Sequence, residues 1–226
     1  MKRVPNRTSG FSLLELMIVV AVIGIIAGIA VPNLLASRAT ANERAILATL
    51  RTLSTAQAQC RGQAVLDIDH DGQGEALGLG ELAGTEQLRS GDGRLVPSSL
   101  SASVGTLDAF GYAHNKGYLL ALYLPDVTGT GVLATPTNAG AVHPNYAEVA
   151  WSCLAWPITR GNTGTACYFV NQTGEILVAT TAPYSGMTSI PLAGSALVGV
   201  PPTQIVAGAL AVNTVGADGN FWHVLQ

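Results

Sequence analysis

Cysteine and charge are both scarce in this 226-residue sequence. Its three cysteines (Cys60, Cys153 and Cys167) are too few for a disulfide framework and lack the spacing of a zinc site. Only 11% of the residues are charged, and from residue 62 onward four basic residues stand against twelve acidic ones, a balance of −8. An acidic surface of this kind repels phosphate backbones, so a nucleic-acid partner is not expected.

The common catalytic motifs are missing as well. The sequence has no Gly-rich phosphate loop, no nucleophile elbow and no zinc-binding helix motif. Its four histidines are scattered through segments that resemble loops: His70, His114, His143 and His223. We therefore expect no enzyme, although a membrane-tethered enzyme stays open because a missing motif is weak evidence.

One long apolar run is present, at residues 11–31. About 20 apolar residues are enough to cross a bilayer, and the basic leader at residues 1–10 predicts that the N-terminus stays in the cytoplasm. Two other interpretations are a cleaved secretory signal and a simple signal anchor. The run is longer than a secretory signal usually has and continues into a further helical pattern, which argues against cleavage at its end.

Glu15 interrupts this apolar run. An ionised carboxylate within hydrocarbon costs roughly 2.5–3.5 kcal/mol, so it needs a partner. The pattern of a short basic leader ending in Gly10, then Phe11, then Glu15 and an unbroken apolar helix resembles the N-terminus of type IV prepilins. The resemblance covers about the first 60 residues.

The resemblance implies how the precursor matures and assembles. A membrane-embedded prepilin peptidase would cut between Gly10 and Phe11 and methylate the new amine of Phe11. Glu15 would then pair with the Phe11 amine of a neighbouring subunit, which would set the stagger between helices. Pro32 matches a proline of the family at which the helix is kinked or loosened, because proline lacks the amide donor that a helix interior needs.

A helical period continues beyond Pro32. One stripe collects five residues, which should pack on a sheet: Ile46, Leu50, Leu53, Gln57 and Cys60. We therefore expect three parts: a leader at 1–10, one helix at 11–61 with its transmembrane part at 11–31, and an extracytoplasmic head at 62–226.

The head, residues 62–226, has the pattern of strands and loops. Strands are expected at residues 117–124, 149–155, 166–171 and 174–180, with a tight turn at 171–174. Residues 181–211 predict loops with one or two edge strands. The predicted fold class is α+β and pilin-like, with the amphipathic half of the helix packed on a small antiparallel sheet.

Two cysteines fall on consecutive predicted strands of the head. Antiparallel pairing could bring Cys153 opposite Cys167, which predicts a disulfide that would add about 3 kcal/mol in the chain-entropy model. Two reduced, buried cysteines are the alternative.

An acidic segment follows the helix. Its residues Asp67, Asp69, Asp71, Gln73 and Glu75 resemble the first half of an EF-hand loop, with Gly72 at the sharp turn. The match predicts Ca²⁺, the one cofactor expected here. The twelfth position is Gly78, so Glu75 or a distant acid would have to replace the usual glutamate. A plain acidic turn is the alternative.

These observations predict a structural role in a filament. The expected partners are further copies of the chain, the prepilin peptidase, an inner-membrane assembly platform and the membrane itself. The precursor would cross the inner membrane once, and the mature chain would join a periplasmic or cell-surface filament. A type IV pilus subunit, a type II secretion pseudopilin, and a minor pilin that binds surfaces or DNA all fit the N-terminal pattern.

Overall fold

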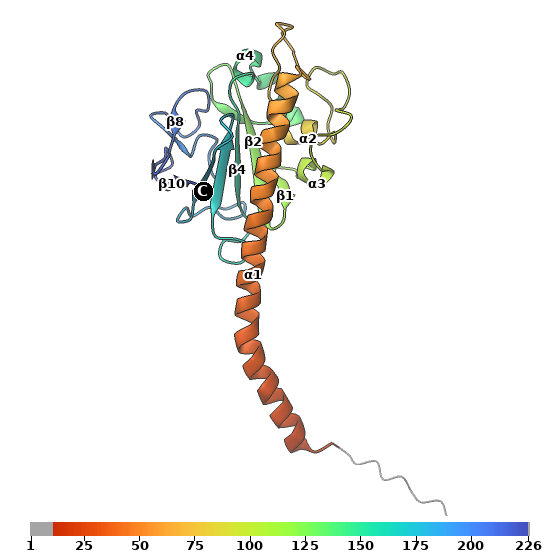
Figure 1. Cartoon of the computed structure of the whole chain (residues 1–226), viewed down its shortest axis with the longest axis vertical. Coiled ribbons are helices and arrows are strands. Elements are labelled where there is room, and N and C mark those ends of the chain that lie inside the picture. The colour runs from red at the N-terminus through yellow and green to blue at the C-terminus, as the bar shows by residue number, and fades with distance from the viewer. Residues whose placement is uncertain (1–10, 226) are drawn as a thin grey trace, which may run out of the picture. The chain divides into compact units, whose positions relative to one another are not determined.

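The computed structural model describes residues 11–225. The predicted leader at residues 1–10, with Gly10, lies outside the described residues. The chain divides into two compact units, one ending at Arg38 and the other beginning at Ala39. Helix α1, Leu13–Gly62, contributes residues to both units (Figure 1).

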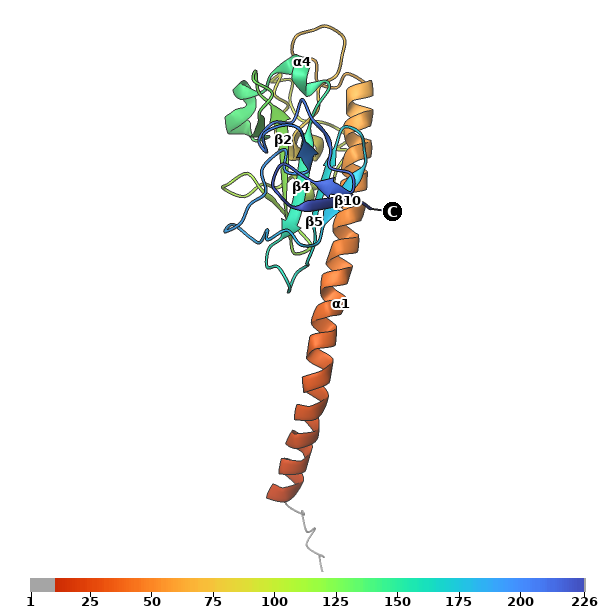
Figure 2. The same cartoon turned by 90° about the vertical axis from the view of Figure 1, so that its left-hand side faces the viewer.

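The second half of α1 belongs to the core of the second unit. The predicted stripe is confirmed, because its members are at most 3% exposed: Ile46, Leu50, Leu53, Gln57 and Cys60. Residues 39–62 lie along the sheet of the head, as both views show (Figures 1 and 2). Burial of this apolar stripe stabilises the C-terminal half of the helix more than helix propensity alone could.

The main sheet is antiparallel, in the strand order β1-β2-β4-β5-β6-β10-β9, with β3 also paired to β2. Its strands are β1 (Ala113–Asn115), β2 (Tyr118–Pro125), β3 (Gly131–Leu133), β4 (Ser152–Pro157), β5 (Cys167–Asn171), β6 (Ile176–Ala179), β9 (Thr214–Val215) and β10 (Phe221–Val224). The four predicted strands correspond to β2, β4, β5 and β6, which are neighbours in this order. An α+β, pilin-like architecture is therefore confirmed.

The turn between β5 and β6 falls at the predicted residues 171–174. Gly174 donates its backbone N–H to the carbonyl of Asn171 at 3.0 Å and has a φ of 78°, a conformation that favours glycine. The Asn171 side chain accepts from the N–H of Thr173 at 3.1 Å. This local bonding fixes the register of the hairpin.

Both faces of the main sheet are covered. One face packs on residues 46–60 of α1 and on the segment from Leu66 to Val104. The opposite face, which includes Trp222 of β10, packs on residues between β6 and β10, among them Tyr184 and Leu197. The central strands β2, β4, β5 and β6 are consequently buried along almost their whole length.

The remaining elements are short. They are the helices α2 (Leu79–Leu82), α3 (Ala102–Gly105) and α4 (Pro144–Ala147), the 3₁₀ helix η1 (Pro136–Ala141), and a separate two-stranded sheet of β7 (Leu197–Val198) and β8 (Ala209–Leu210). Residues 181–211 thus form loops with two short strands, and these strands pair with each other instead of lying at the edge of the main sheet, where edge strands were predicted. The C-terminal tail docks on the main sheet through β10, whose Trp222 is fully buried.

Candidate functional site

The start of α1 carries the predicted assembly residues. Ser12 precedes the helix, and its hydroxyl oxygen accepts the backbone N–H of Glu15 at 3.3 Å, while its carbonyl accepts the N–H of Leu16 at 3.2 Å. Ser12 is thus an N-cap residue, and Glu15 stands at the third helical position, where a negative charge is favoured by the helix dipole. The Ser-x-x-Glu spacing is a signal of helix capping that our sequence analysis missed.

The Glu15 side chain is exposed, and within residues 11–225 its carboxylate makes no hydrogen bond or ion pair. Phe11 is 71% exposed. The interaction that the resemblance implies, between Glu15 and the Phe11 amine of another subunit, would use two groups that this chain leaves accessible.

The first half of α1 has no core of its own. All of residues 11–38 are exposed, and the large apolar side chains among them include Leu13, Ile18, Ile23 and Leu34. Among the described helices, α1 alone is long and apolar enough to cross a membrane, by length and composition. So much exposed apolar surface indicates a contact with lipid or with other protein chains.

Two glycines and one proline of this half-helix bear on how it can pack against a partner. At Gly24 and Gly28 an added Cβ would meet nothing within 4 Å, so both positions leave room for a close neighbour. Pro32 lies inside α1, and the helix continues on both sides of it. The predicted kink at Pro32 stays a prediction.

The predicted disulfide needs correction. Strands β4 and β5 do pair, but Cys153 lies opposite Val170. The side chain of Cys153 belongs to the core on the α1 face, whereas Cys167 belongs to the core on the other face. Both are buried free thiols, as is Cys60. Burial raises the pKa of the Cys153 and Cys167 thiols, so both behave as small apolar core residues.

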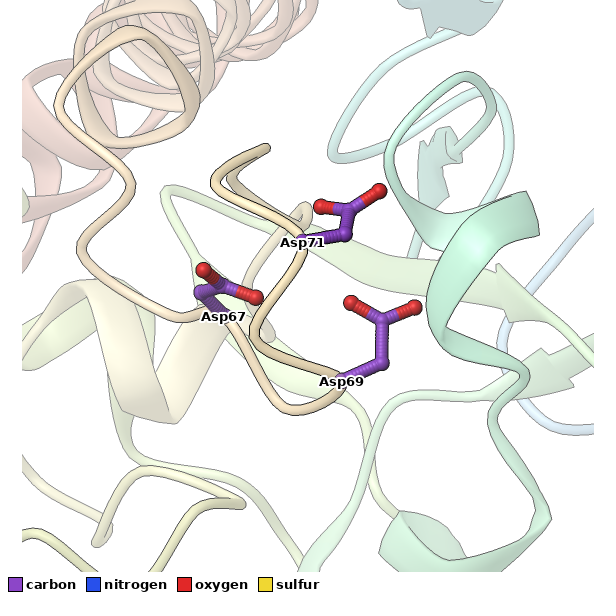
Figure 3. Close-up of side chains that lie close together, drawn as sticks. All are labelled: Asp67, Asp69 and Asp71. Carbon is purple, nitrogen blue, oxygen red and sulfur yellow. The ribbon is translucent and has the colours of Figure 1, made fainter.

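The acidic loop after α1 does bring three predicted residues together. Carboxylate oxygens of Asp67, Asp69 and Asp71 lie within 4.8 Å of one another (Figure 3). Asp67 accepts the N–H of Gly72 at 3.0 Å, and Asp71 accepts the N–H of Gln73 at 2.8 Å. Gly72 has a φ of 90°, which explains why glycine stands at this turn.

The predicted ligand Glu75 is turned away from this cluster. One of its oxygens accepts the N–H of Ile68 at 2.8 Å, and the other is 3.2 Å from the guanidinium of Arg89. Its side chain is 1% exposed. Since both oxygens are engaged, Glu75 is a structural partner of Arg89, and its assignment as a metal ligand is corrected.

Arg89 joins two buried carboxylates that the sequence analysis did not connect. It pairs with Glu75 and also with Glu81, at 2.7 Å, and donates to the Ala76 carbonyl at 2.7 Å. Glu81 additionally accepts the N–H of Gly78. Removing one member of such a buried cluster would leave an uncompensated charge, so this group ties α2 to the segment that follows the acidic loop.

The comparisons with known proteins concern a part of the chain. Residues 5–31 match the family model described as the prokaryotic N-terminal methylation motif. The type IV major pilin protein PilA of Myxococcus xanthus is 49% identical over 51 residues, which are 23% of this chain and 23% of that protein. The type IV wide pilus major component PilA4 of Thermus thermophilus is 51% identical over 45 residues, 20% of this chain and 34% of that protein.

The matches therefore span about a quarter and a third of the two relatives. No solved structure matches the chain. The similarity supports a pilin-type N-terminal segment and carries no information on what the head binds.

Proposed function

We propose that this chain, which carries the N-terminal methylation motif of the type IV pilin-like family, is a structural subunit of a type IV pilus-like filament. The observation that carries the proposal is the apolar first half of α1, which is exposed along its whole length and overlaps that motif. In a filament this surface would be covered by the same segment of neighbouring subunits. The role is structural, and no catalytic step is needed for it.

The precursor would be anchored in the inner membrane by residues 11–31, with its N-terminus in the cytoplasm. A prepilin peptidase would cleave between Gly10 and Phe11 and methylate Phe11. An inner-membrane assembly platform would then move the mature subunit into the filament. The basic leader and the length of the apolar run support this order of events.

Two observations bear on the kind of filament. Both relatives are described as major components of type IV pili, which favours a pilus over a type II secretion pseudopilus. The balance of −8 from residue 62 onward disfavours a minor pilin for DNA uptake, because DNA is a polyanion.

Glu15 would organise the assembly. In an apolar filament core its carboxylate requires a cation, and the amine of Phe11 in an adjoining subunit would provide one. Loss of one member of a buried ion pair typically costs about 3–5 kcal/mol, because the other charge is left uncompensated. The exposed positions of Phe11 and Glu15 in the single chain leave both groups accessible to another subunit.

The first experiment determines the mature N-terminus by mass spectrometry of surface filaments. We expect the chain to begin with N-methylated Phe11. A chain that begins near residues 36–40 would show that a secretory peptidase removes the helix, and the filament proposal would be wrong.

The second experiment compares sheared filaments with cell-associated mature protein for variants of Glu15. Glu15→Ala and Glu15→Gln should be processed normally but yield filament reduced by more than about tenfold, whereas Glu15→Asp should assemble partly because it keeps the charge with a shorter reach. Methylation of Phe11 is measured in parallel, since its loss could mimic an assembly defect.

Ser12→Ala is the matched control for Glu15. It removes the N-cap hydrogen bond, worth about 1 kcal/mol, and leaves the carboxylate in place. We expect its filament yield to stay close to wild type. If Glu15→Ala assembles as well as wild type with no compensating subunit present, Glu15 does not organise assembly.

A further inference from the structure

A cavity of about 270 Å³ lies between residues 78–91, which include α2, and residues 134–142, which include η1. Its apolar lining residues come from both segments and from β2: Leu88, Leu124, Ala134, Pro136, Ala139 and Val142. A cavity of this size and lining suits a small organic molecule with an apolar body better than it suits a hydrated ion.

Glu86 lines this cavity with a carboxylate that lacks a partner. Within residues 11–225 this side chain makes no hydrogen bond or ion pair. It lies against the backbone of Gly80, where an added Cβ would collide with the Glu86 carboxylate. The missing side chain of Gly80 therefore leaves the room in which this carboxylate is held.

Glu86 also lines a second cavity, of about 280 Å³. The two cavities share Glu86, Thr135 and Pro136. Glu86 is partly exposed. Because it belongs to the walls of both cavities, its carboxylate is accessible to a molecule that enters from solvent.

The walls offer no cation to Glu86. Among the described residues, Arg89 is the one basic residue that lines either cavity, and its terminal nitrogens are already bonded to Glu75 and Glu81. Burial raises the pKa of the Glu86 carboxyl, and the negative charge of Glu81 raises it further. A cation that entered the cavity would favour the ionised carboxylate.

Arg89 contributes an unpaired donor to the same cavity lining. Its side chain is 6% exposed, and its Nε atom is buried without a hydrogen-bond partner in the described part of the chain. A buried N–H without an acceptor is costly, so a ligand that supplied an oxygen atom to it would be stabilised. The lining thus combines an unpaired carboxylate and an unpaired donor with apolar walls.

We propose that this cavity binds a primary amine that carries an acceptor oxygen beside it on an apolar body, as in the N-terminal end of a peptide or a free amino-acid amide. The ammonium group pairs with Glu86, in a charge-assisted hydrogen bond that is stronger than a neutral one. The oxygen accepts the Nε–H of Arg89, and the apolar part lies against the apolar lining. The site is independent of filament assembly, since all of it lies in the second compact unit.

The test is calorimetric titration of L-leucinamide into the full chain in a nonionic detergent, at neutral pH and constant ionic strength. We expect a dissociation constant in the millimolar range, as is usual for so small a ligand. Isocaproamide, which lacks only the amine, should bind at least about tenfold more weakly. Isoamylamine, which lacks only the amide, should bind more weakly by a smaller factor.

Three results of these titrations would overturn the proposal. Absence of leucinamide binding would show that the cavity takes no such ligand. Equal binding of isocaproamide would show that the amine is not recognised. Equal binding of isoamylamine would show that Arg89 contributes no donor to the ligand.

Glu86→Gln tests the carboxylate. This variant removes an unpartnered charge, so it should melt at the same or a higher temperature than wild type. It should bind L-leucinamide at least about tenfold more weakly and should no longer distinguish it from isocaproamide. Wild-type affinity in Glu86→Gln would overturn the proposal. If the variant melts below wild type, the comparison of the two amides on the wild-type chain decides instead.

Glu175→Gln is the control for a general charge effect. Glu175 is exposed and lines neither cavity, so we expect this variant to bind L-leucinamide as wild type does. An equal loss of affinity in Glu175→Gln and Glu86→Gln would show that the acidic surface attracts any amine, and the site would be rejected.

The peptide Leu-Gly-Gly amide distinguishes the two sources of this chemistry. Binding at least as tight as that of L-leucinamide would assign the site to the N-terminus of a peptide. Loss of binding would assign it to a small free amine, because the longer chain would then be excluded.

Discussion

The two halves of α1 share one backbone conformation and differ in what surrounds their side chains. Residues 13–38 are exposed on every side, whereas residues 39–62 bury one stripe against the sheet and expose the rest. The first half is apolar all round, and the second half is amphipathic. The difference indicates that the second half is stabilised within its own chain, while the first half depends on lipid or on other chains for a covered surface.

Because of this difference, we expect assembly to depend on the first half of α1 and the stability of the head to depend on the second half. Substitutions in residues 13–38 should change how the chain meets its surroundings, and substitutions on the buried stripe should change whether the head stays folded.

The largest expected effect comes from removing residues 1–38. The fragment 39–226 should be monomeric without detergent, should keep a cooperative thermal transition and should be absent from filaments, because the second unit holds its own core. Size-exclusion chromatography and calorimetry measure this.

A fragment 62–226 is the control for that truncation. It lacks the stripe as well, exposes one face of the sheet, and should show no cooperative transition. If both fragments fold equally well, the second half of α1 is dispensable and the contrast between the halves fails.

Matched leucine substitutions in the two halves come next. Leu50 is fully buried, and Leu50→Ala should lower the free energy of unfolding by about 2–5 kcal/mol, since it leaves a cavity under the sheet. Leu35 is 42% exposed, and Leu35→Ala should change that free energy by less than about 0.5 kcal/mol. Denaturant titration of the full chain in detergent compares them, and equal losses would contradict the assignment of the core.

Substitution of Gln57, the polar member of the stripe, should have a smaller effect. The amide of Gln57 donates to the Leu77 carbonyl at 2.6 Å and accepts the Leu77 N–H at 3.0 Å, so Gln57→Leu leaves two buried backbone groups unpaired. We expect a loss of about 1–3 kcal/mol in the same titration. Gln59 is exposed, and Gln59→Leu is the control that should stay near wild type. A loss in both variants would indicate a general effect of adding leucine to the helix.

The smallest expected effect is the pH-dependent contribution that a turn in the head, at Asp126, makes to stability. The Asp126 carboxylate accepts hydrogen bonds from the Thr128 hydroxyl and from the N–H groups of Thr128 and Thr130, and these hydrogen bonds lower its pKa below 3.8. The ionised carboxylate therefore contributes to the free energy of unfolding above about pH 3.8. That contribution is lost as the pH falls through the pKa of Asp126 in the folded state.

Asp126→Asn tests this turn. We expect the variant to lower the free energy of unfolding at pH 7 by less than about 1 kcal/mol, because water screens a partly exposed carboxylate. Its melting temperature should also change less with pH below about pH 4 than that of the wild type. A wild-type pH profile in the variant would show that other acids control this range.

Local patterns predicted much of the fold. The stripe from Ile46 to Cys60 followed from the helical period, and the strands β2, β4, β5 and β6 followed from apolar runs bounded by turn residues. The strand register could not be predicted in this way, because it depends on pairings between distant segments. For this reason Cys153 was expected to face Cys167, although the register places Val170 opposite it.

The acidic loop shows the same limit of what local sequence patterns can predict. The spacing of Asp67, Asp69 and Asp71 is local and predicted that their carboxylates would gather. The engagement of Glu75 by Arg89 and the position of Glu148 beside the loop depend on tertiary packing. A motif of a few residues contains no information on which distant side chain engages one of its members.

The place of β10 in the main sheet has a consequence for biogenesis. Phe221–Val224 pairs with β6, and Trp222 is packed within the second core. A nascent chain grows at roughly 5–20 residues per second from its N-terminus, so β6 leaves the ribosome before the strand that pairs with it. The sheet cannot acquire its full set of strand pairings until residues 221–224 have been synthesised, and the tertiary structure of the head closes only after that point.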